Sequence, residues 1–462
     1  MTHYHLIGIG GTGLSAIARV LLEMGHTVTG SDRAASPFTR DLESAGVTVS
    51  LGHRPENLVG AEIVVRSSAI PNDNPEVIAA RAVGIPVYKR VDFLGSLMEG
   101  KTGIAVAGTH GKTTTTSMLA WVFTALHQDP TFISGGVLAN LGVNAHAGKG
   151  AAFIIEADEY DRMFLGLKPA IEIVTNVEHD HPDCYPAPAD FQAAFVDFVH
   201  LLPTDGTLIA CAEDDGARRL LQEAEGLGRA ALSYGLRPMT EDGALEVDTF
   251  AEVLTLNERG GFTVGARVVG DGVTVSLQVP GHHNVRNALA VLTVVHLLGL
   301  DLAKAAQALA DFQGTGRRFE VRGEAGGVTV IDDYAHHPTE IRATLAAARL
   351  RYPGRRLWAV WQPHTYSRTQ ALFDEFTRAF GDADEVLVTE IYASREAKQD
   401  FSSRQVVEAM SHPAAHFSGE LEETCRTLVS KLRPGDVLLV LSAGDADTVS
   451  ETVLGALQER AA

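Results

Sequence analysis

The sequence contains few cysteines, and this scarcity excludes two kinds of site. Its 462 residues include Cys184, Cys211 and Cys425, which are far apart and form no CxxC pair. Without paired thiols, neither a disulfide framework nor a cysteine zinc site is expected. The cysteine content fits a reducing compartment, and we expect a cytoplasmic protein.

Basic charge is also in short supply. The chain has 38 Lys and Arg against 58 Asp and Glu, a net charge of −20 at pH 7. Such a surface repels nucleic-acid phosphates and anionic membranes at long range. Small anionic ligands remain compatible with it, because they need only a few local donors. We therefore expect no nucleic-acid partner and no stable membrane association.

Long hydrophobic runs are absent as well. The longest apolar stretch, Leu289 to Leu300, contains His296 and is shorter than the roughly 20 residues that span a bilayer. The chain runs from Met1 into an apolar strand pattern without a basic segment or cleavage site, unlike a secretory signal. These features predict a soluble protein, for which a monomer–dimer equilibrium stays open.

What the sequence does contain is an alternation of strand and helix patterns, which is typical of parallel α/β sheets. Its length of 462 residues corresponds to about three domains at roughly 100–200 residues each. We predict a Rossmann-like domain at residues 1–100, a central phosphate-loop domain at 101–312 and a Rossmann-like α/β domain at 313–462. Short alternating runs within 230–280 predict a small antiparallel β insertion in the central domain.

A glycine-rich turn follows the first predicted strand. Gly8-Ile9-Gly10-Gly11-Thr12-Gly13 has the G-x-G-x-x-G spacing that lets a backbone approach a pyrophosphate at a helix start. Asp32 ends the second strand, where a dinucleotide site holds a ribose hydroxyl. A tight turn without ligand, a nicotinamide site and a site for another pyrophosphate all remain open at this point.

A second loop is more specific. Gly108-Thr109-His110-Gly111-Lys112-Thr113 lies between a strand and a helix. Backbone N–H groups of such a loop surround phosphates, the lysine neutralises charge, and the threonine hydroxyl reaches Mg²⁺. Val106 stands where the full Walker pattern has its first glycine. The core of the loop still predicts nucleotide binding.

Six further polar clusters stand out. Four follow predicted strands, where ligands of open parallel sheets sit, one starts a predicted helix at 281–287, and one lies near the junction to the third domain at 316–320. In the central domain, carboxylates and imidazoles of this kind can hold divalent cations. Asn284 could merely cap a helix. The clusters are Glu156-Ala157-Asp158-Glu159, Asn176-Val177-Glu178-His179-Asp180-His181, Gly281-His282-His283-Asn284-Val285-Arg286-Asn287, Gly316-Arg317-Arg318-Phe319-Glu320, Asp332-Asp333-Tyr334-Ala335-His336-His337-Pro338 and Gln362-Pro363-His364-Thr365-Tyr366-Ser367-Arg368-Thr369.

Taken together and in this order, these motifs resemble those of the Mur ligases. The matching phrases are GxGGxG, GTHGKTTT, EADE, TNVEHDH, GxHNxxNA, GTGRRFE, DDYAHHPTE and QPHTYSRT, from Gly8 to Arg368. The resemblance implies a first domain that binds a UDP-sugar, a central domain that binds ATP and Mg²⁺, and a third domain that binds an amino acid and closes on the others.

The resemblance also implies a role for individual residues. Catalytic roles fall to Lys112, Asn176, His181 and His336. The ATP site comprises Gly108, Thr109, His110, Gly111, Lys112, Thr113, Thr114, His283, Asn284, Asn287, Arg318 and Asp333. The UDP-sugar site comprises Gly8, Gly10, Gly11, Thr12, Gly13, Ser15, Asp32 and Ser67. His336 and Arg368 would receive the amino acid, and Thr113, Glu156 and His181 would bind the metal.

Two departures from the family pattern bear on these roles. Several members hold a second metal with a carbamoylated lysine, but no lysine lies between Lys168 and Lys304; the alanine-adding branch shares that absence. Some members carry arginine after the histidine of QPH, where this chain has Thr365. We therefore expect Arg368 to carry more of the contact with the amino-acid carboxylate.

The implied reaction is ATP-dependent ligation of L-alanine to the carboxylate of UDP-N-acetylmuramate through an acyl phosphate, a step of peptidoglycan precursor synthesis. The nearest alternative is a recycling ligase that adds a murein peptide to the same sugar acid. A nicotinamide dehydrogenase leaves the GTHGKT loop without a role. A nucleotide-switch protein leaves the polar strand ends of the third domain unexplained.

Overall fold

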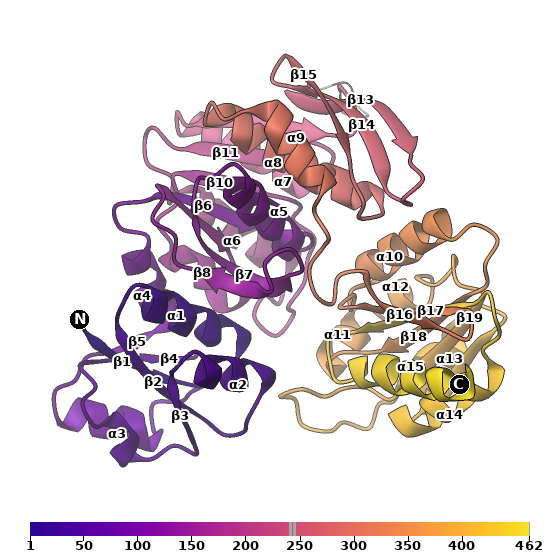
Figure 1. Cartoon of the computed structure of the whole chain (residues 1–462), viewed down its shortest axis with the longest axis horizontal. Coiled ribbons are helices and arrows are strands. Elements are labelled where there is room, and N and C mark those ends of the chain that lie inside the picture. Colours follow the sequence, from indigo (N-terminus) through magenta and orange to yellow (C-terminus); the bar gives the residue numbers. More distant parts are fainter. Residues whose placement is uncertain (240–242, 244–245, 462) are drawn as a thin grey trace.

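The structure is a computed structural model that describes residues 1–239, 243 and 246–461. These residues form three α/β units, each built on its own sheet and arranged in an arc (Figure 1). The predicted three-domain α/β fold class is confirmed. The exact boundaries and the ligand of each domain stay predictions.

The first unit has a fully parallel sheet in the order β3-β2-β1-β4-β5. Because β1 lies between β2 and β4, the chain crosses to the other half of the sheet after β3. Ligands of such sheets bind at this reversal point, and the Gly8–Gly13 turn lies there. The elements are β1 (His3–Ile7), α1 (Thr12–Glu23), β2 (Thr27–Asp32), α2 (Pro37–Ser44), β3 (Thr48–Leu51), η1 (Pro55–Leu58), β4 (Ile63–Arg66), α3 (Pro75–Ala82), β5 (Val87–Lys89) and α4 (Arg90–Leu97).

The central unit contains the largest described sheet, in the order β15-β14-β13-β12-β11-β10-β6-β9-β7-β8. Its strands β6, β9 and β10 are almost wholly buried, as their apolar runs predict. The elements are β6 (Thr102–Ala107), α5 (Lys112–Ala125), β7 (Thr131–Leu138), β8 (Val143–His146), β9 (Ala152–Glu156), η2 (Tyr160–Gly166), β10 (Ile171–Val174), α6 (Pro188–Val199), β11 (Thr207–Cys211), α7 (Asp215–Gly226), β12 (Ala230–Gly235), β13 (Thr249–Leu256), β14 (Phe262–Val268), β15 (Asp271–Ser276), α8 (His282–Leu297) and α9 (Leu302–Ala310).

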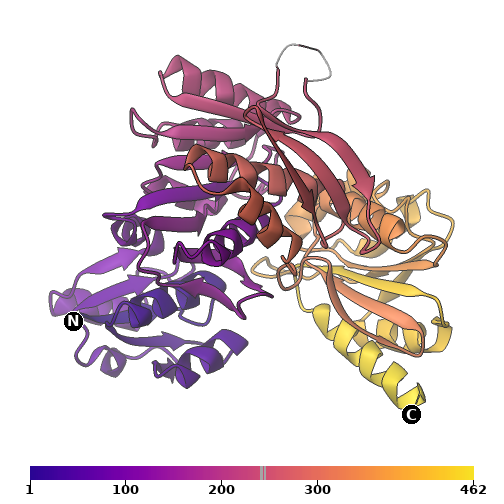
Figure 2. The same cartoon turned by 45° about the horizontal axis from the view of Figure 1, so that its top comes forward.

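The segment expected as a β insertion extends this central sheet. Strands β13, β14 and β15 are antiparallel to one another, as predicted. β13 nevertheless pairs in parallel with β12 through Tyr234 and Thr249, so the three strands cover what would be an open sheet edge (Figure 2). Part of the 230–280 range lies outside the described residues.

The third unit is a mixed sheet in the order β16-β17-β21-β18-β19-β20. β17, β21 and β18 are parallel neighbours, and their register places Asp333 beside Leu441 and Gln362 beside Ser442. The polar strand ends therefore share one edge. The elements are β16 (Glu320–Ala325), β17 (Val328–Asp333), α10 (Pro338–Arg351), β18 (Leu357–Gln362), α11 (Tyr366–Ala371), α12 (Phe373–Phe376), β19 (Glu385–Thr389), α13 (Ser403–Ala409), β20 (Ala415–Gly419), α14 (Leu421–Lys431), β21 (Val437–Ser442) and α15 (Asp447–Ala461).

The hydrophobic cores divide the molecule unequally. One continuous cluster of buried residues runs from Leu6 of the first unit to Phe312 at the end of the central unit. The third unit has its own clusters on the two faces of its sheet, around Trp361 and Trp358. The third unit therefore has a hydrophobic core of its own, separate from the core of the first two units. Within the described residues, no helix is long and apolar enough to cross a membrane.

Candidate active site

The phosphate loop is held in shape by the strand beside it. Gly108 has a φ of +132°, and a Cβ there would lie 2.0 Å from Thr175 Oγ1, so only glycine fits. Asn176 Oδ1 accepts from the N–H of His110 at 2.9 Å, and its Nδ2 donates to the His110 carbonyl at 3.0 Å. Asn176, predicted to be catalytic, therefore clamps the loop in this structure.

Lys112 begins α5 and points back into the loop. Its Nζ donates to the carbonyls of Gly108 at 2.5 Å and Thr109 at 3.1 Å, and pairs with Glu159 at 2.8 Å. Burial alone would raise the pKa of Glu159, but Lys112 and His181 hold it below its ordinary value. His181 Nε2 lies 3.4 Å from the same carboxylate. Glu159 thus links the predicted phosphate-binding lysine to the predicted catalytic histidine.

Of the three predicted metal ligands, Thr113 and Glu156 are in direct contact. Thr113 Oγ1 donates to Glu156 Oε1 at 2.9 Å, and the N–H of Gly135 donates to Glu156 Oε2 at 2.6 Å. Burial raises the pKa of Glu156, against the opposing effect of Lys112. A buried carboxylate beside a hydroxyl is a hard oxygen donor set that suits Mg²⁺. His181 contacts Glu159 instead.

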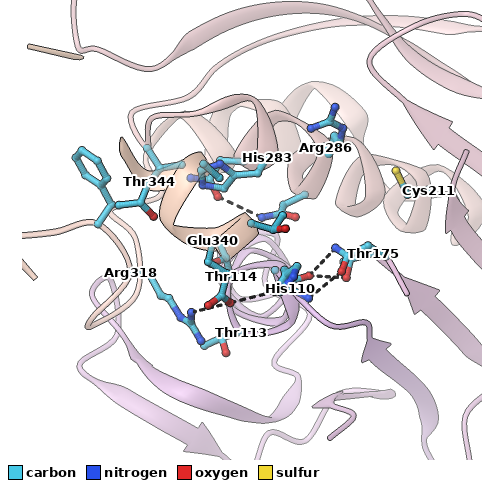
Figure 3. A pocket seen from close by; sticks show the side chains of 18 of the residues that line it. His110, Thr113, Thr114, Thr175, Cys211, His283, Arg286, Arg318, Glu340 and Thr344 are labelled. Atoms are coloured by element: carbon cyan, nitrogen blue, oxygen red, sulfur yellow. Dashed lines mark hydrogen bonds and ion pairs between the residues drawn. The ribbon is translucent and has the colours of Figure 1, made fainter. Parts of the chain in front are cut away.

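A cavity of about 330 Å³ opens next to this loop, between the central and third units. Figure 3 shows its labelled side chains, with Arg318 and Glu340 of the third unit facing His110. Most of the predicted ATP residues line it: His110, Gly111, Thr113, Thr114, His283, Asn284, Asn287, Arg318 and Asp333. Gly108, Thr109 and Lys112 belong to the same loop but do not line the cavity.

Helix α8 and the ends of β11 and β12 line a further part of the cavity. Burial lowers the pKa of His283 to about 4, so its imidazole is neutral at physiological pH. The helix is capped by Gly281, and Asn284 lies inside its first turn, donating to the Pro280 carbonyl at 2.7 Å. The capping role considered for Asn284 is therefore wrong. Its amide and that of Asn287, 3.2 Å apart, face the cavity as a pair.

His110 joins the central unit to the third. Its Nε2 lies 2.8 Å from Glu178 of the central unit, and its Nδ1 lies 3.2 Å from Glu340 at the start of α10. Burial opposes protonation, yet the two carboxylates raise the pKa of His110 to about 9. Ligand atoms of His110, Glu178 and His337 lie within 4.8 Å of one another. Both ring nitrogens of His110 are paired with carboxylates, so this structure holds the cluster as an ion-pair network.

Asp333 and Arg318 occupy the third-unit side of the cavity. The Asp333 carboxylate accepts from the N–H groups of Phe319 and Ala335, each at 2.7 Å. Burial raises its pKa to about 6 despite Arg318 nearby. The Arg318 guanidinium lies 4.9 Å from the centre of the Tyr334 ring and 3.9 Å from Glu340. Both side chains are oriented toward the cavity by these neighbours.

The glycine-rich turn lies away from this cavity, in the first unit. The N–H of Gly10 donates to Asp32 Oδ2 at 2.8 Å, so Asp32 braces the turn in this structure. Ser15 Oγ donates to the Thr12 carbonyl at 3.0 Å. A Cβ on Gly8 would lie 3.2 Å from Ser67. The predicted UDP-sugar residues thus form one local cluster at the carboxyl end of β1.

A second cavity, of about 160 Å³, connects the first unit to the central one. Thr12, Gly13 and Arg90 line one side, and Gly135, Glu156 and Asp158 line the other. Arg90 spans the gap through a 3.0 Å ion pair with Asp158. Since Thr113 lines the first cavity and contacts Glu156 in the second, the two cavities meet at the Thr113–Glu156 hydrogen bond.

The predicted amino-acid residues lie between the central and third units. His336 Nδ1 lies 2.9 Å from the Tyr334 carbonyl, and burial lowers the pKa of His336 to about 3. Arg368, on α11, pairs with Asp180 through Nε at 2.9 Å and Nη2 at 3.2 Å. Its Nη1 lies 3.0 Å from His364 Nδ1. Arg368 is therefore already engaged by a carboxylate of the central unit.

Several members of this network lie within the sequence motifs, but the family resemblance implies no role for them. Glu159 pairs with Lys112, Asp180 with Arg368, and Glu178 and Glu340 with His110. The motifs mark these acids as candidate site residues. They do not reveal the pairing, because the partner of each acid lies in a different motif. Arg90 belongs to no motif, and no sequence signal marked it.

The phosphate loop opens into one cavity, and its Thr113 contacts a carboxylate that lines a second cavity. This arrangement is typical of an enzyme that uses ATP. The chain matches three family descriptions: "Mur ligase family, catalytic domain" over residues 3–102, "Mur ligase middle domain" over 106–295, and "Mur ligase, glutamate ligase domain" over 317–444. The chain belongs to the Mur ligase family, and it is an ATP-dependent ligase.

Its relatives cover the whole chain. It is 44% identical over 478 residues to the UDP-N-acetylmuramate–L-alanine ligase of Roseiflexus sp. (strain RS-1), covering 99% of this chain and 100% of that protein. It is 45% identical to the protein of the same name from Nitratidesulfovibrio vulgaris (strain DP4), with 97% of each chain covered.

Solved structures show the same relationship. The UDP-N-acetylmuramate–alanine ligase of Thermotoga maritima matches with a TM-score of 0.82 at 28% identity, covering 100% of both chains. A murein peptide ligase from Psychrobacter arcticus matches with a TM-score of 0.73 at 28% identity, covering 99% of both chains.

Proposed function

We propose that this protein ligates L-alanine to the carboxylate of UDP-N-acetylmuramate at the expense of ATP. The products are UDP-N-acetylmuramoyl-L-alanine, ADP and phosphate, and the reaction belongs to peptidoglycan precursor synthesis. Relatives at 44% and 45% identity over nearly the full chain carry this activity in their names. The murein peptide ligase neighbour has the lower TM-score of the two structures, 0.73 against 0.82, which favours the alanine reaction over peptide recycling.

The observation that carries the proposal is the junction of the two cavities. ATP in the larger cavity would direct its phosphates at Lys112 and Thr113, and the sugar acid, bound at the first unit, would reach Glu156 through the smaller one. The Thr113–Glu156 contact of 2.9 Å is where these compartments meet. A phosphate donor and a carboxylate acceptor bound in this way would meet at one point, which is the main requirement of phosphoryl transfer.

The first chemical step is attack of the sugar-acid carboxylate on the γ-phosphorus of ATP, which releases ADP and forms an acyl phosphate. Lys112 stabilises the charge on the transferring phosphoryl group once that group displaces Glu159 from its ammonium. Thr113 and Glu156, with His181 nearby, are the residues that would hold Mg²⁺, and the ion would supply further neutralisation of phosphate charge.

The second step is attack of the amine of alanine on the acyl carbon, which expels phosphate. The amine must lose a proton. Burial lowers the pKa of His336 to about 3, so its imidazole is a weak base. We propose the substrate phosphate as the proton acceptor. Closure of the third unit over the site excludes water, which would hydrolyse the acyl phosphate.

The test is ADP release by the full chain with UDP-N-acetylmuramate, Mg²⁺ and a panel of L-alanine, glycine, L-serine and a murein tripeptide. We expect release that requires the sugar acid and is fastest with L-alanine. Faster release with the tripeptide would assign the chain to peptide recycling. No release with any amine would reject the ligase reaction.

A further inference from the structure

Arg368 cannot supply the net charge that a substrate carboxylate requires. Its side chain is 6% exposed and forms a two-point contact with Asp180, which is equally buried. The Asp180 carboxylate accepts from both Nε and Nη2 of Arg368, so the charge of this arginine is already matched by an opposite charge. Nη1 pairs with no carboxylate; it lies 3.0 Å from His364 Nδ1 and carries a second N–H that can donate to an anion.

A second arginine lies at the same interface with its charge unbalanced. Arg395 is exposed, and within the described residues no carboxylate pairs with it. Its guanidinium carbon lies 4.4 Å from the centre of the Tyr160 ring, across the boundary between the third and central units. A cation stacked on an aromatic face stays available at its edges, where its N–H groups can donate to an anion.

The loop that carries Arg395 is fixed beside the QPH segment. Tyr392 exchanges backbone hydrogen bonds with that segment, donating to Pro363 at 2.8 Å and accepting from Thr365 at 2.9 Å. The Glu396 carboxylate accepts from the N–H groups of Tyr366 at 2.7 Å and Ser367 at 3.1 Å. Glu396 thereby caps α11, the helix of Arg368, and holds Arg395 at the same end of it.

The interface also links Arg395 to the reacting groups. The Tyr160 ring lies 5.1 Å from the His181 ring, and His181 contacts Glu159, the partner of Lys112. On the other side, the charges of Arg368 and Arg395 add to burial in lowering the pKa of His364 to about 4. The neutral His364 competes with neither arginine for an anion.

We propose that Arg395 binds the carboxylate of the incoming amino acid, with Nη1 of Arg368 as its second donor, and so selects amino acids over neutral amines. The proposal rests on the ligase function above and adds a residue that determines its amine specificity. Arg368 fixes the position of the carboxylate, and Arg395 supplies the unbalanced positive charge.

The experiment compares L-alanine with L-alaninamide, which has the same amine but no carboxylate, in the full chain and in Arg395→Ala. Turnover is measured by ADP release, or by inhibition of alanine use if the amide reacts too slowly. We expect the preference for alanine over the amide to fall by about tenfold or more, the effect of one lost charge-assisted hydrogen bond. The KM values for ATP and UDP-N-acetylmuramate should stay within about twofold, and Arg395→Lys should restore part of the preference.

Arg404 provides a matched control. It is an exposed arginine of the same unit, stacked 4.2 Å from the Phe417 ring and distant from the interface. Arg404→Ala should leave the preference unchanged. Tyr160→Leu removes the stacking partner and its edge contact with His181 while retaining Arg395, so it reports on the packing at this interface and not on the arginine charge.

An unchanged preference in Arg395→Ala overturns the proposal. An equal loss of turnover with alanine and with alaninamide also overturns it, because Arg395 would then serve only the contact between the units. In that case Tyr160→Leu should cause the same loss of turnover. Failure of the proposed ligase function would be recognised separately from failure of this inference, because the unaltered protein would then release no ADP with alanine.

Discussion

Lys112 is the side chain whose removal should cost the most activity. Its ammonium lies among two loop carbonyls and Glu159, where phosphate oxygens of ATP would replace the carboxylate. We expect Lys112→Ala to lower the ligation rate by at least about a hundredfold, the effect of one lost contact to transition-state charge. ADP release under saturating substrates measures this.

Lys101→Ala is the control for that variant. Lys101 is also partly buried and donates to the carbonyls of Gly148 at 2.7 Å and Gly150 at 2.8 Å, but it lies outside the phosphate loop. It should retain most of the activity. Near-normal turnover of a folded Lys112→Ala would exclude the phosphate-binding role.

Arg368 should affect the amino acid selectively. We expect Arg368→Lys to raise the KM for alanine strongly and the KM for ATP little, because lysine keeps the charge but loses the fork geometry. Arg368→Ala should be worse, since it removes the two-point partner of the buried Asp180 carboxylate, a loss that typically costs about 3–5 kcal/mol of stability. Steady-state constants for each substrate and a thermal melt separate the two effects.

Arg356→Lys is the matched variant for Arg368. Arg356 makes the same two-point contact, to Asp436 at 3.0 and 2.6 Å, on the far edge of the third unit. It should alter stability without changing the KM for alanine. If the KM for ATP rises in Arg368→Lys while that for alanine stays constant, Arg368 belongs to the nucleotide site.

Among the structural elements, the turn between β1 and α1 offers a test of the UDP-sugar site. A Cβ on Gly10 would lie 2.9 Å from Asp32 Oδ2, so Gly10→Ala disturbs the turn itself. A Cβ on Gly11 would meet only the Gly8 carbonyl, at 3.6 Å, and the φ of Gly11 is −80°. Gly11→Ala therefore fits the fold and projects into the space in which a pyrophosphate would lie.

We expect Gly11→Ala to weaken binding of UDP-N-acetylmuramate to the full chain by at least about tenfold, because the added methyl separates the backbone from the phosphates. ATP binding should be retained. Gly381→Ala, which has open space around its Cα, controls for the substitution. Calorimetric titration with the UDP-sugar and with NAD decides between the ligands. Unaltered UDP-sugar affinity, or saturable NAD binding, would contradict the assignment.

Across the whole molecule, the contacts of the third unit with the central one are mainly polar, whereas the first two units share a hydrophobic core. Polar interfaces between domains open more readily than apolar ones. The charged His110 between Glu178 and Glu340 is a central contact of this interface. We therefore expect the contact to govern how far the third unit closes.

The expected pH dependence follows from the sign of the His110 shift. Against the effect of burial, Glu178 and Glu340 together raise the pKa of His110 from 6.5 to about 9, and only the contact with Glu340 is broken when the third unit opens. Because His110 binds its proton more tightly in the closed form, that form should decline as the pH rises through about 9. Small-angle scattering should show an expansion over this range that His110→Gln abolishes. An identical pH profile in His110→Gln would remove His110 from the closing contact.

A double-mutant cycle tests the same contact at fixed pH. His110→Gln and Glu340→Gln should be non-additive in kcat by about 0.5–3 kcal/mol, as expected for residues in direct contact. Thr339, also on α10, donates its hydroxyl to Glu178 across the same interface at 2.8 Å. The non-additivity in kcat of Thr339→Ala with Glu340→Gln is therefore the value with which that of the His110–Glu340 pair is compared. Strict additivity of the His110–Glu340 pair would show that each acts separately.

The sequence by itself determined the features that consecutive residues create. The phosphate loop needs Gly108 and Gly111 at backbone positions that other residues avoid, and Lys112 and Thr113 at a helix start. The parallel α/β class follows from the alternation of strand and helix patterns. The strand ends at Asp333 and Gln362 follow from the polar residues that come after apolar strands. The family motifs then indicated the enzyme class, because their order along the chain is specific.

Only the tertiary structure decided which charges pair and which remain free. His110 and Glu340 are 230 residues apart in sequence, and Arg368 and Asp180 are 188 apart, so no local pattern relates them. Asp32 is a predicted ligand contact of the first unit, and the structure shows in addition that it braces Gly10, because β2 ends beside the turn. Arg395 matches no motif, and its unbalanced charge shows only where two units meet. Electrostatic pairing depends on distance in space, and the packing of separate units sets those distances.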